Sequence, residues 1–550
     1  MSSLLSHVLM EVFLLILNDT SPIEWEKNEP PTHHLISNSF VFVPSAGMRL
    51  APEILLLELF REVFYQSHSE NGKTKDLFPN EKTDDQTYYY NNGERAVLYA
   101  LKGRRKKTKQ SKNQPFFTPA YPELARNAWL GNKRERIIVN FLFGRSVGKH
   151  NQEHTVCAPI SQYFWSQGET QAKKLEHQNF INIFFNALVG NNSCQGNNND
   201  RKGKEILSAT IVDSLIDFEE IAKKNIYEKT TSTSVIKIPE DKLSSRIFND
   251  LTALCELEKN MPRLQWLYVF MTFLRFSLPI WLLAQMRITS LIHAWLIDAI
   301  DFGKIPSQQL IEKKLTDRYK GLLHPTLTPS REIFEHTEQY IKHRVEINIS
   351  FYLLEKIVQG KFQDRLAKLE VNGAGNQVVT IEQLLILSRD HAFEIKNHSG
   401  VESEVKSGKF ADMLTRIAER SAAWRDPLKK GQGKNIDEFF RVLYRDNVGD
   451  ELGGYLLMPE GRGSSRGFRV FPGQLLLKTI TILANYEKHQ KLGGGGKLVL
   501  EDVENHFFQY GIDFDHAADA RPQLISELQA MGLLKGSPDA GSSVAVACPY

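Results

Sequence analysis

The sequence has few cysteines, little net charge and no long uncharged apolar run, and each shortage excludes a class of protein. Its four cysteines, Cys157, Cys194, Cys255 and Cys548, lie far apart without a CxxC pair, so neither a zinc site nor a disulfide framework is signalled. We therefore predict no cofactor, no metal site and a reducing cytoplasm as the compartment. With 68 Lys+Arg against 65 Asp+Glu, the net charge of +3 steers the chain toward no particular partner.

Two apolar stretches need separate treatment, because each has a feature of a membrane or targeting segment. Residues 4–17 lack a preceding basic residue and a small-residue cleavage site and contain Glu11, so we predict a core element rather than a signal peptide. Residues 264–297 are interrupted by Arg275, Pro279 and Arg287, which leaves no uncharged run long enough to span a bilayer. We predict a buried helical hairpin or kinked helix, with its arginines bound by carbonyls or acids or extending to the core's edge, and no stable membrane insertion.

The length and composition predict a globular chain of several folding units. It has 550 residues, of which 41% are hydrophobic and 24% are charged. Helical spacing of apolar residues dominates the middle, and Asn/Gly-rich and Arg/Gly-rich segments indicate boundaries. We predict a mainly α, multidomain protein with these parts: an α+β N-terminal region over 1–190, a flexible linker over 191–204, an all-α middle domain over 205–458, an Arg/Gly-rich linker over 459–473 and a winged-helix-like domain over 474–550.

The C-terminal part has the clearest order of elements. Apolar spacing predicts helices over 474–489, 501–510 and 521–531, and two short β runs follow around a Gly/Pro/Asp/Ser turn. Three helices and a β-hairpin in this order resemble the winged helix-turn-helix family. The resemblance implies a third helix in the major groove and a wing near phosphate. Because that helix offers only Arg521 beside Glu527 and the wing only Lys535, docking to a protein or dimerisation is the alternative to DNA contact.

Two basic loops are the other candidates for nucleic-acid contact. The first, within residues 103–114, is followed by Phe116 and Phe117, which are available to stack on bases; the alternative is a solvated loop without function. The second belongs to the Arg/Gly-rich linker. The complete set of predicted phosphate contacts is Arg104, Arg105, Lys106, Lys107, Lys109, Lys112, Arg462, Arg466, Arg469, Arg521 and Lys535.

A metal-dependent nuclease is the rival hypothesis from another class. It needs an acid pair and a lysine around Mg²⁺, and Asp390 with Glu394 and Lys396, or with Glu404 and Lys406, supplies those residue types. Such acids ordinarily sit on adjacent strands, whereas the flanking segments here have helical spacing. The simpler interpretation is therefore a solvated helix face, and we predict no catalytic residue.

Other chemical motifs are incomplete. The segment "VNFLFGRSVGKH" is one residue short of a phosphate-binding loop and has His150 where a hydroxyl residue should bind Mg²⁺. His336 and His343 share a predicted helix with several glutamates, but the Glu-x-x-His pair of a bundle metal site is absent. We interpret the two histidines as part of a polar helix surface.

The aromatic middle, "RLQWLYVFMTFLRFSLPIWLLAQ", together with the winged-helix-like end, resembles accessory proteins of bacterial anti-phage defence operons. The resemblance is to the DptG-type component of phosphorothioation-dependent restriction and to the non-enzymatic subunit of methylation-associated defence systems. It implies a subunit that works beside a separate DNA-translocating ATPase and modification enzymes. We predict a non-catalytic DNA-binding or adaptor subunit, with the nuclease or a pure scaffold as alternatives.

Overall fold

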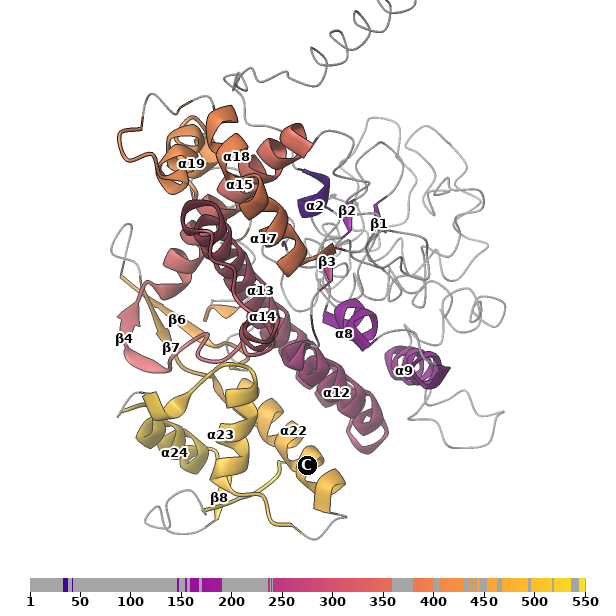
Figure 1. Ribbon diagram of the computed structural model, residues 1–550. Coiled ribbons are helices and arrows are strands. Elements are labelled where there is room, and N and C mark those ends of the chain that lie inside the picture. The colour runs from indigo at the N-terminus through magenta and orange to yellow at the C-terminus, as the bar shows by residue number, and fades with distance from the viewer. Residues whose placement is uncertain are drawn as a thin grey trace, which may run out of the picture.

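A computed structural model (Figure 1) describes most of the chain after residue 241 and short parts before it. The described residues are 33–37, 42, 146–147, 154–155, 159–167, 171–189, 236–237, 239, 241–358, 379–399, 401, 405–428, 436, 440, 443–445, 453–461, 467–492, 496–516, 519–535 and 544–549.

These residues form a mainly helical structure, as predicted. The longest helix is α13 (Arg263–Phe302), which ends at Gly303 with φ 65°. The other helices are α2 (His34–Ser37), α8 (Pro159–Gln167), α9 (Gln171–Val189), α12 (Lys242–Leu257), η4 (Glu258–Asn260), α14 (Gln308–Thr316), α15 (Glu332–Val358), α17 (Ile381–Asp390), α18 (Ala392–His398), α19 (Phe410–Ala418), α20 (Ala422–Arg425), α22 (Gln474–Leu492), α23 (Leu500–Gln509), η9 (Phe514–His516) and α24 (Ala520–Ala530).

Helix α13 is the apolar stretch that raised the membrane question. It runs continuously through Pro279, so the predicted hairpin is wrong. Gln265–Phe302 is apolar and long enough to cross a membrane, but 89% of its most apolar window is buried inside the protein, as in the core helix of a soluble protein. Arg275 donates to the Tyr444 carbonyl at 2.9 Å, and Arg287 donates to the carbonyls of Arg318, Lys320 and Gly321 at 3.2, 2.6 and 3.1 Å. Backbone carbonyls therefore bind both arginines, one of the arrangements that the sequence predicted.

The strands of the described residues are few and short. The largest sheet has the order β4-β7-β6, and both of its pairings are antiparallel. Strands β3 and β5 pair in parallel, and β1–β2 and β8–β9 pair antiparallel. Their bounds are β1 (Ser146–Val147), β2 (His154–Thr155), β3 (Ile236–Lys237), β4 (Thr326–Ser330), β5 (Val379–Thr380), β6 (Leu457–Glu460), β7 (Gly467–Val470), β8 (Leu534–Lys535) and β9 (Ala545–Val546).

The segment predicted as an Arg/Gly-rich linker contains the end of β6 and all of β7. Phe468 and Val470 are buried, and β7 lies between β4 and β6 in the sheet. A Cβ on Gly467 would lie 2.9 Å from Cβ of Pro329 in β4, so the two strands pack closely there. The described part of 459–473 is consequently packed into the protein, because a glycine and two apolar residues fit the narrow space beside β4.

Two hydrophobic cores form along α13. The first core surrounds the N-terminal half of α13 and also includes residues of α8, α9, α12, the β4-β7-β6 sheet, α22, α23 and α24. The second core surrounds the C-terminal half of α13 with residues of α2, β3, β5, α14, α15, α17, α18 and α19. Elements from the predicted middle domain and the predicted C-terminal domain thus share the first core.

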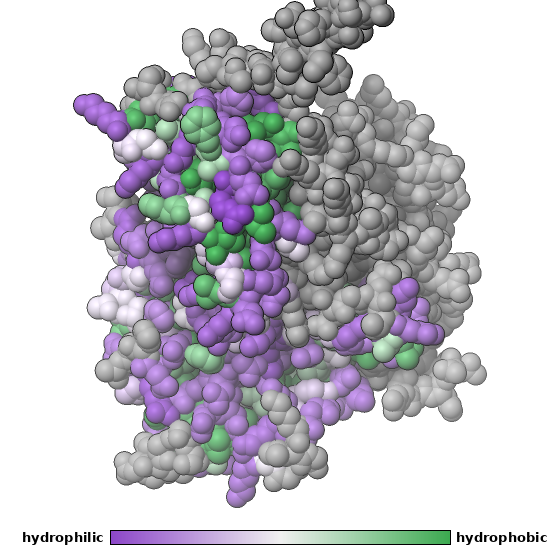
Figure 2. All heavy atoms as spheres, in the orientation of Figure 1, coloured by the Kyte–Doolittle hydropathy of each residue, from purple (hydrophilic) through white to green (hydrophobic). Residues whose placement is uncertain are grey.

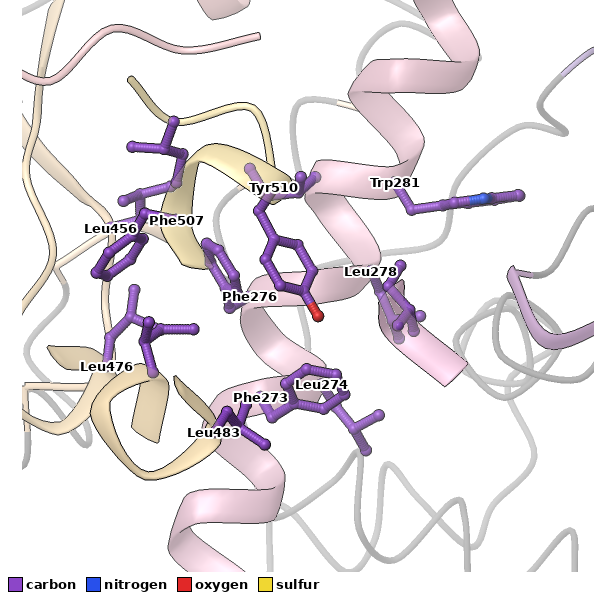
Figure 3. Close-up of a cluster of buried hydrophobic side chains, with 14 of the residues drawn as sticks. Phe273, Leu274, Phe276, Leu278, Trp281, Leu456, Leu476, Leu483, Phe507 and Tyr510 are labelled. Atoms are coloured by element: carbon purple, nitrogen blue, oxygen red, sulfur yellow. The ribbon is translucent and has the colours of Figure 1, made fainter. Parts of the chain in front are cut away.

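The C-terminal elements follow the predicted order: α22, α23, α24 and the β8–β9 hairpin, which together we call the C-terminal unit. Figure 3 shows Phe276 of α13 beside Phe507 of α23 and Tyr510, the residue directly after α23. The ring centroids of Phe276 are 6.3 Å from Phe507 and 5.0 Å from Tyr510. Helix α22 also packs against α13. The apolar face of the C-terminal unit is therefore covered by α13, and the unit lies at the lower end of α13 in Figure 1.

Candidate functional site

The C-terminal unit is the candidate interaction site, and the structure places only part of the predicted cations. Arg469, Arg521 and Lys535 are described. Arg104, Arg105, Lys106, Lys107, Lys109, Lys112, Arg462 and Arg466 lie outside the described residues, as does the predicted linker 191–204.

The cation of the third helix is bound within the protein. Arg521 of α24 donates to both carboxylate oxygens of Glu504 in α23, from Nε at 2.7 Å and from Nη2 at 3.1 Å. The exposed residues of α24 are uncharged, namely Pro522, Ser526, Gln529 and Ala530, whereas Glu527 is half-buried. A phosphate would have to compete with Glu504 for this guanidinium, so α24 presents little positive charge to DNA.

The other two described cations differ in their surroundings. Arg469 of β7 forms an ion pair with Glu460 of β6 across the hairpin. Lys535, at the end of β8, is exposed and has no ion pair among the described residues. Among the described part of the predicted contacts, Lys535 is thus the cation most accessible to a phosphate. The structure does not bring Arg469 together with Arg521 and Lys535 in any contact that it describes.

A buried network of charged and polar side chains joins the C-terminal unit to α12. Arg246 of α12 donates to Glu487 of α22 at 2.7 Å and forms a second ion pair with Asp250 one turn along its own helix. Tyr510, directly after α23, donates from Oη to Asp250 Oδ2 at 2.7 Å, and His506 Nε2 of α23 lies 3.0 Å from the same oxygen. We call these residues the α12–α23 network. It fixes the two helices to each other.

The electrostatics of this network are those of a closed interior site. Asp250, His506 and Tyr510 are exposed by only 2%, 1% and 0%. Burial raises the pKa of Asp250, but the charges of His506 and Arg246 outweigh burial and hold the pKa below its usual value. Burial, and then the carboxylate of Asp250, raises the pKa of Tyr510 well above its usual value. With these three side chains out of solvent, the described contacts of the network hold α12, α22 and the end of α23 together.

The sequence analysis missed this network. The Arg246 and Asp250 spacing of four residues on a helix was a local signal for an ion pair. Nothing local pointed to His506 and Tyr510, which are 256 and 260 residues from Asp250 in the chain.

A second buried polar cluster lies at the start of α12. Asp241 caps the helix by accepting from the Leu243 amide at 3.1 Å, and its carboxylate also pairs with Arg318 at 2.5 Å. Gln162 of α8 donates to the same carboxylate at 2.9 Å. Since Asp241, Gln162 and Arg318 are all buried, this cluster holds α8, α12 and the loop after α14 together.

The nuclease residues do not form the arrangement that metal catalysis requires. Asp390 and Glu394 are on helices, and Asp390 pairs with its neighbour Arg389. Lys396 instead pairs with Asp301 of α13, at 2.8 Å. Glu404 lies outside the described residues, and Lys406 is exposed in the loop before α19. A helical scaffold therefore turns Lys396 toward α13, which supports the solvated-face interpretation of Asp390.

The two histidines of α15 also separate. His336 lies 3.5 Å from Glu332 on the same helix. His343 instead stacks on His293 of α13, with ring centroids 4.1 Å apart, and His293 Nε2 lies 2.6 Å from Glu346. No group of three metal-ligating side chains occurs among the residues that the structure describes. His343 and Glu346 thus take part in packing between α13 and α15.

Neither a protein-family model nor a curated protein sequence matches this chain.

Proposed function

We propose that this protein is a non-catalytic adaptor subunit of a bacterial anti-phage, restriction-type defence complex in the cytoplasm. It would act beside a separate ATPase and modification enzymes. The proposed assembly rests on the resemblance of the aromatic middle and the winged-helix-like end to accessory proteins of defence operons. The adaptor role rests on the contacts of the C-terminal unit.

The C-terminal unit is, in this proposal, a winged helix that binds another protein. The order α22, α23, α24 and the β8–β9 hairpin supports the winged-helix assignment. The protein-binding role rests on the two hydrogen bonds from Arg521 to Glu504. They engage the only cation of α24 inside the protein, so that this guanidinium is not free to bind a phosphate. An uncharged exposed helix face suits a protein partner better than a phosphate backbone.

The α12–α23 network supports the adaptor role in a second way. An adaptor transmits the position of one partner to another only if its binding unit is fixed to the remainder of the chain. The α12–α23 network provides such a connection, because it links α12 to α22, to α23 and to the residue that follows α23.

The proposal also includes contact with DNA, which the two basic loops and Lys535 would make. Neutralising Arg104, Arg105, Lys106, Lys107, Lys109, Lys112, Arg462 and Arg466 should lower affinity for a fluorescein-labelled duplex and reduce the salt slope by roughly one for each phosphate that is no longer neutralised. Arg521→Ala should leave both unchanged, because Glu504 already occupies that guanidinium. An unchanged affinity and slope in the loop variant would remove DNA contact from the proposal.

The experiment for the assembly is affinity purification of the full-length protein from its native host, with and without nuclease treatment. Recovery of an ATPase or modification enzyme that survives nuclease supports the adaptor role. Recovery of the protein alone, or with nucleic acid only, contradicts it. As a test of the rival, Mg²⁺-dependent cleavage that disappears in Asp390→Ala would replace the adaptor role by a nuclease.

A further inference from the structure

Two histidines from different helices stack on each other beside the second core. The rings of His293 in α13 and His343 in α15 have centroids 4.1 Å apart, and their planes are inclined by 10°. His293 Nε2 lies 2.6 Å from Glu346 Oε2, and His343 Nδ1 lies 3.1 Å from Ser290 Oγ. Two imidazolium rings at this distance repel each other, whereas a neutral ring can stack on a neutral or a protonated one. The pair therefore accommodates one proton, which Glu346 favours on His293, more readily than two.

Glu346 is the acceptor that the histidine pair shares with α19 and α20. Its Oε1 accepts from Trp424 Nε1 of α20 at 3.0 Å and from Thr415 Oγ1 of α19 at 3.5 Å, while Oε2 lies beside His293. Glu346 is buried, with an exposed fraction of 6%. One carboxylate consequently joins the histidine pair to the indole of α20, and both of its oxygens are engaged.

Three side chains supply the charges that act on His343. His293 and Lys342 disfavour a proton on the His343 ring, whereas Glu346 favours it. Burial has the largest effect, and together these causes lower the pKa of His343 from 6.5 to about 4. Helices α18, α19 and α20 also pack against α15. None of the three charges comes from these helices, whose titratable side chains are Glu394, Lys396, His398, Asp412, Arg416 and Arg425.

We propose that the His293–His343 pair is a proton-operated contact that controls the docking of α20 on α15. When both rings are protonated, they repel each other and compete for the carboxylate of Glu346. A hydrogen bond from an imidazolium is stronger than one from a neutral indole, so Glu346 Oε1 leaves Trp424 and α20 loses its hydrogen bond to α15. With one proton or none on the pair, that hydrogen bond is kept. The contact operates within one chain and is independent of the adaptor role.

The direction of the pH dependence follows from the two states of the contact. In the open state the His343 ring is in water and its pKa is near the ordinary 6.5, whereas the closed state lowers that pKa to about 4. The open state therefore binds the proton first as the pH falls, and the closed state is favoured fully only above pH 6.5. The equilibrium constant for opening should rise by up to about thirtyfold between pH 7.5 and 5.

The position and length of α20 allow a local opening. Helices α15, α17, α18 and α19 lie in the upper half of Figure 1, and Figure 2 shows hydrophobic patches among hydrophilic ones over α17 and α18 there. Helix α20 has four residues, none of which is buried. Its release would therefore expose little additional apolar surface and leave the second core closed.

The test follows Trp424 by fluorine NMR in the full chain labelled with 5-fluorotryptophan. The resonance that is absent from Trp424→Phe belongs to Trp424. Between pH 7.5 and 5 this resonance should move or be joined by a second one, while the far-ultraviolet circular dichroism stays constant. His343→Gln should abolish the change, because glutamine takes up no proton. His177→Gln removes another buried histidine whose pKa is lowered to about 4, so it is the matched control and should keep the change.

A second variant and the circular dichroism make the outcome decisive. His293→Gln leaves Glu346 Oε2 available to a protonated His343, so Oε1 should stay with Trp424 and the change should disappear there as well. A Trp424 resonance that is independent of pH over this range overturns the inference, and so does a change that persists in either histidine variant. A change that accompanies loss of circular dichroism also overturns it, because it reports unfolding of the whole chain. If one histidine variant shows no cooperative thermal transition, the other decides.

Discussion

The two cores along α13 are completed by different parts of the chain. In the first core, α12 meets α22 and α23 through the α12–α23 network, so Arg246 binds Glu487 and Gln509, which are 241 and 263 residues away. In the second core, the amide of His33, directly before α2, donates to Asn348 of α15, which is 315 residues away. Helices near the C-terminal end of the sequence therefore complete the first core, whereas α2 and the residues beside it complete the second.

This difference indicates how each region depends on its polar groups. Within the α12–α23 network, the side chains of Asp250 and His506 are 3% and 0% exposed, and a charge left unpaired there would be costly. The His293–Glu346 pair beside the second core is less enclosed, with side chains 17% and 8% exposed. We therefore expect single substitutions to affect the first core more strongly, and the predictions below run from the largest effect to the smallest.

Asp250→Ala should have the largest effect. It removes the partner of Arg246, His506 and Tyr510 and leaves a buried guanidinium with fewer acceptors. We expect the free energy of unfolding to fall by about 3 to 5 kcal/mol. Denaturant titration followed by circular dichroism measures it. Asp390→Ala, which breaks an exposed pair with Arg389, is the control and should cost at most about 0.5 kcal/mol. Equal effects of the two changes would contradict the comparison.

Gly511→Ala tests the backbone crossing between the C-terminal unit and the loop after α14. Gly511 has φ 79°, its carbonyl accepts from the Leu322 and Leu323 amides, and an added Cβ would lie 1.9 Å from the Tyr319 carbonyl oxygen. We expect a loss of about 3 kcal/mol. Gly303→Ala is the matched control, since Gly303 has φ 65° but no neighbour within 4 Å of a Cβ. That control should lose about 1 kcal/mol, as measured by thermal unfolding. A larger loss of stability in Gly303→Ala than in Gly511→Ala would contradict close packing of the backbone at Gly511 against the loop after α14.

The pH dependence of stability should contain a contribution from each core. Burial is the main cause that lowers the pKa of His343 in the second core to about 4, and the charge of His293 adds to it. Burial lowers the pKa of His177 in α9, which packs against the first core, to about 4 as well. Both histidines ordinarily titrate near 6.5, so the unfolded chain binds protons first as the pH falls. Stability is complete above pH 6.5 and declines from there to about 4.

His343→Gln should remove one part of that decline and His177→Gln the other. We expect each to reduce the loss of unfolding free energy between those pH values by about 2 kcal/mol. Urea titrations at a series of pH values measure the change. A slope that neither variant alters would show that these histidines titrate alike in the folded and unfolded chains.

Thr380→Ala should have the smallest effect. Thr380 Oγ1 accepts from the Gln383 amide at 3.2 Å, and Gln383 Oε1 accepts from the Thr380 amide at 2.8 Å, which forms a capping box at the start of α17. Losing the side-chain acceptor should cost about 1 kcal/mol. Thr380→Ser retains the acceptor and should stay within a few tenths of a kcal/mol of the parent. A loss as large as that of Asp250→Ala would contradict the ranking of the two cores.

The sequence predicted what depends on local patterns. Helical spacing predicted α22, α23 and α24. For Arg275 and Arg287 the sequence left carbonyls, acids or the edge of the core as alternatives, and carbonyls bind both. The hairpin alternative for α13 was wrong because Pro279 is accommodated within one long, buried helix. The packed part of 459–473 was missed because its arginines and glycines resemble a linker, whereas Phe468 and Val470 bind it to the first core.

The candidate site was predicted only in outline. Arg521 was identified as the cation of the third helix. Its hydrogen bond to Glu504 depends on how α23 packs against α24, and the spacing of residues along one helix does not specify that packing. The α12–α23 network joins residues more than 250 positions apart, and the sequence offers no local sign of such a pairing. Stacking of His343 on His293 likewise follows from the packing of α15 against α13, whereas the sequence placed His343 on a polar helix surface.

The most direct test of the integrated C-terminal unit is the amide proton–nitrogen correlation spectrum of residues 474–550 expressed alone. Its apolar face packs on Phe273 and Phe276 of α13 (Figure 3), and its charged groups pair with α12. We expect poorly dispersed peaks and no cooperative thermal transition for the isolated segment. A well-dispersed spectrum with a cooperative transition would show an independent domain and contradict the shared first core.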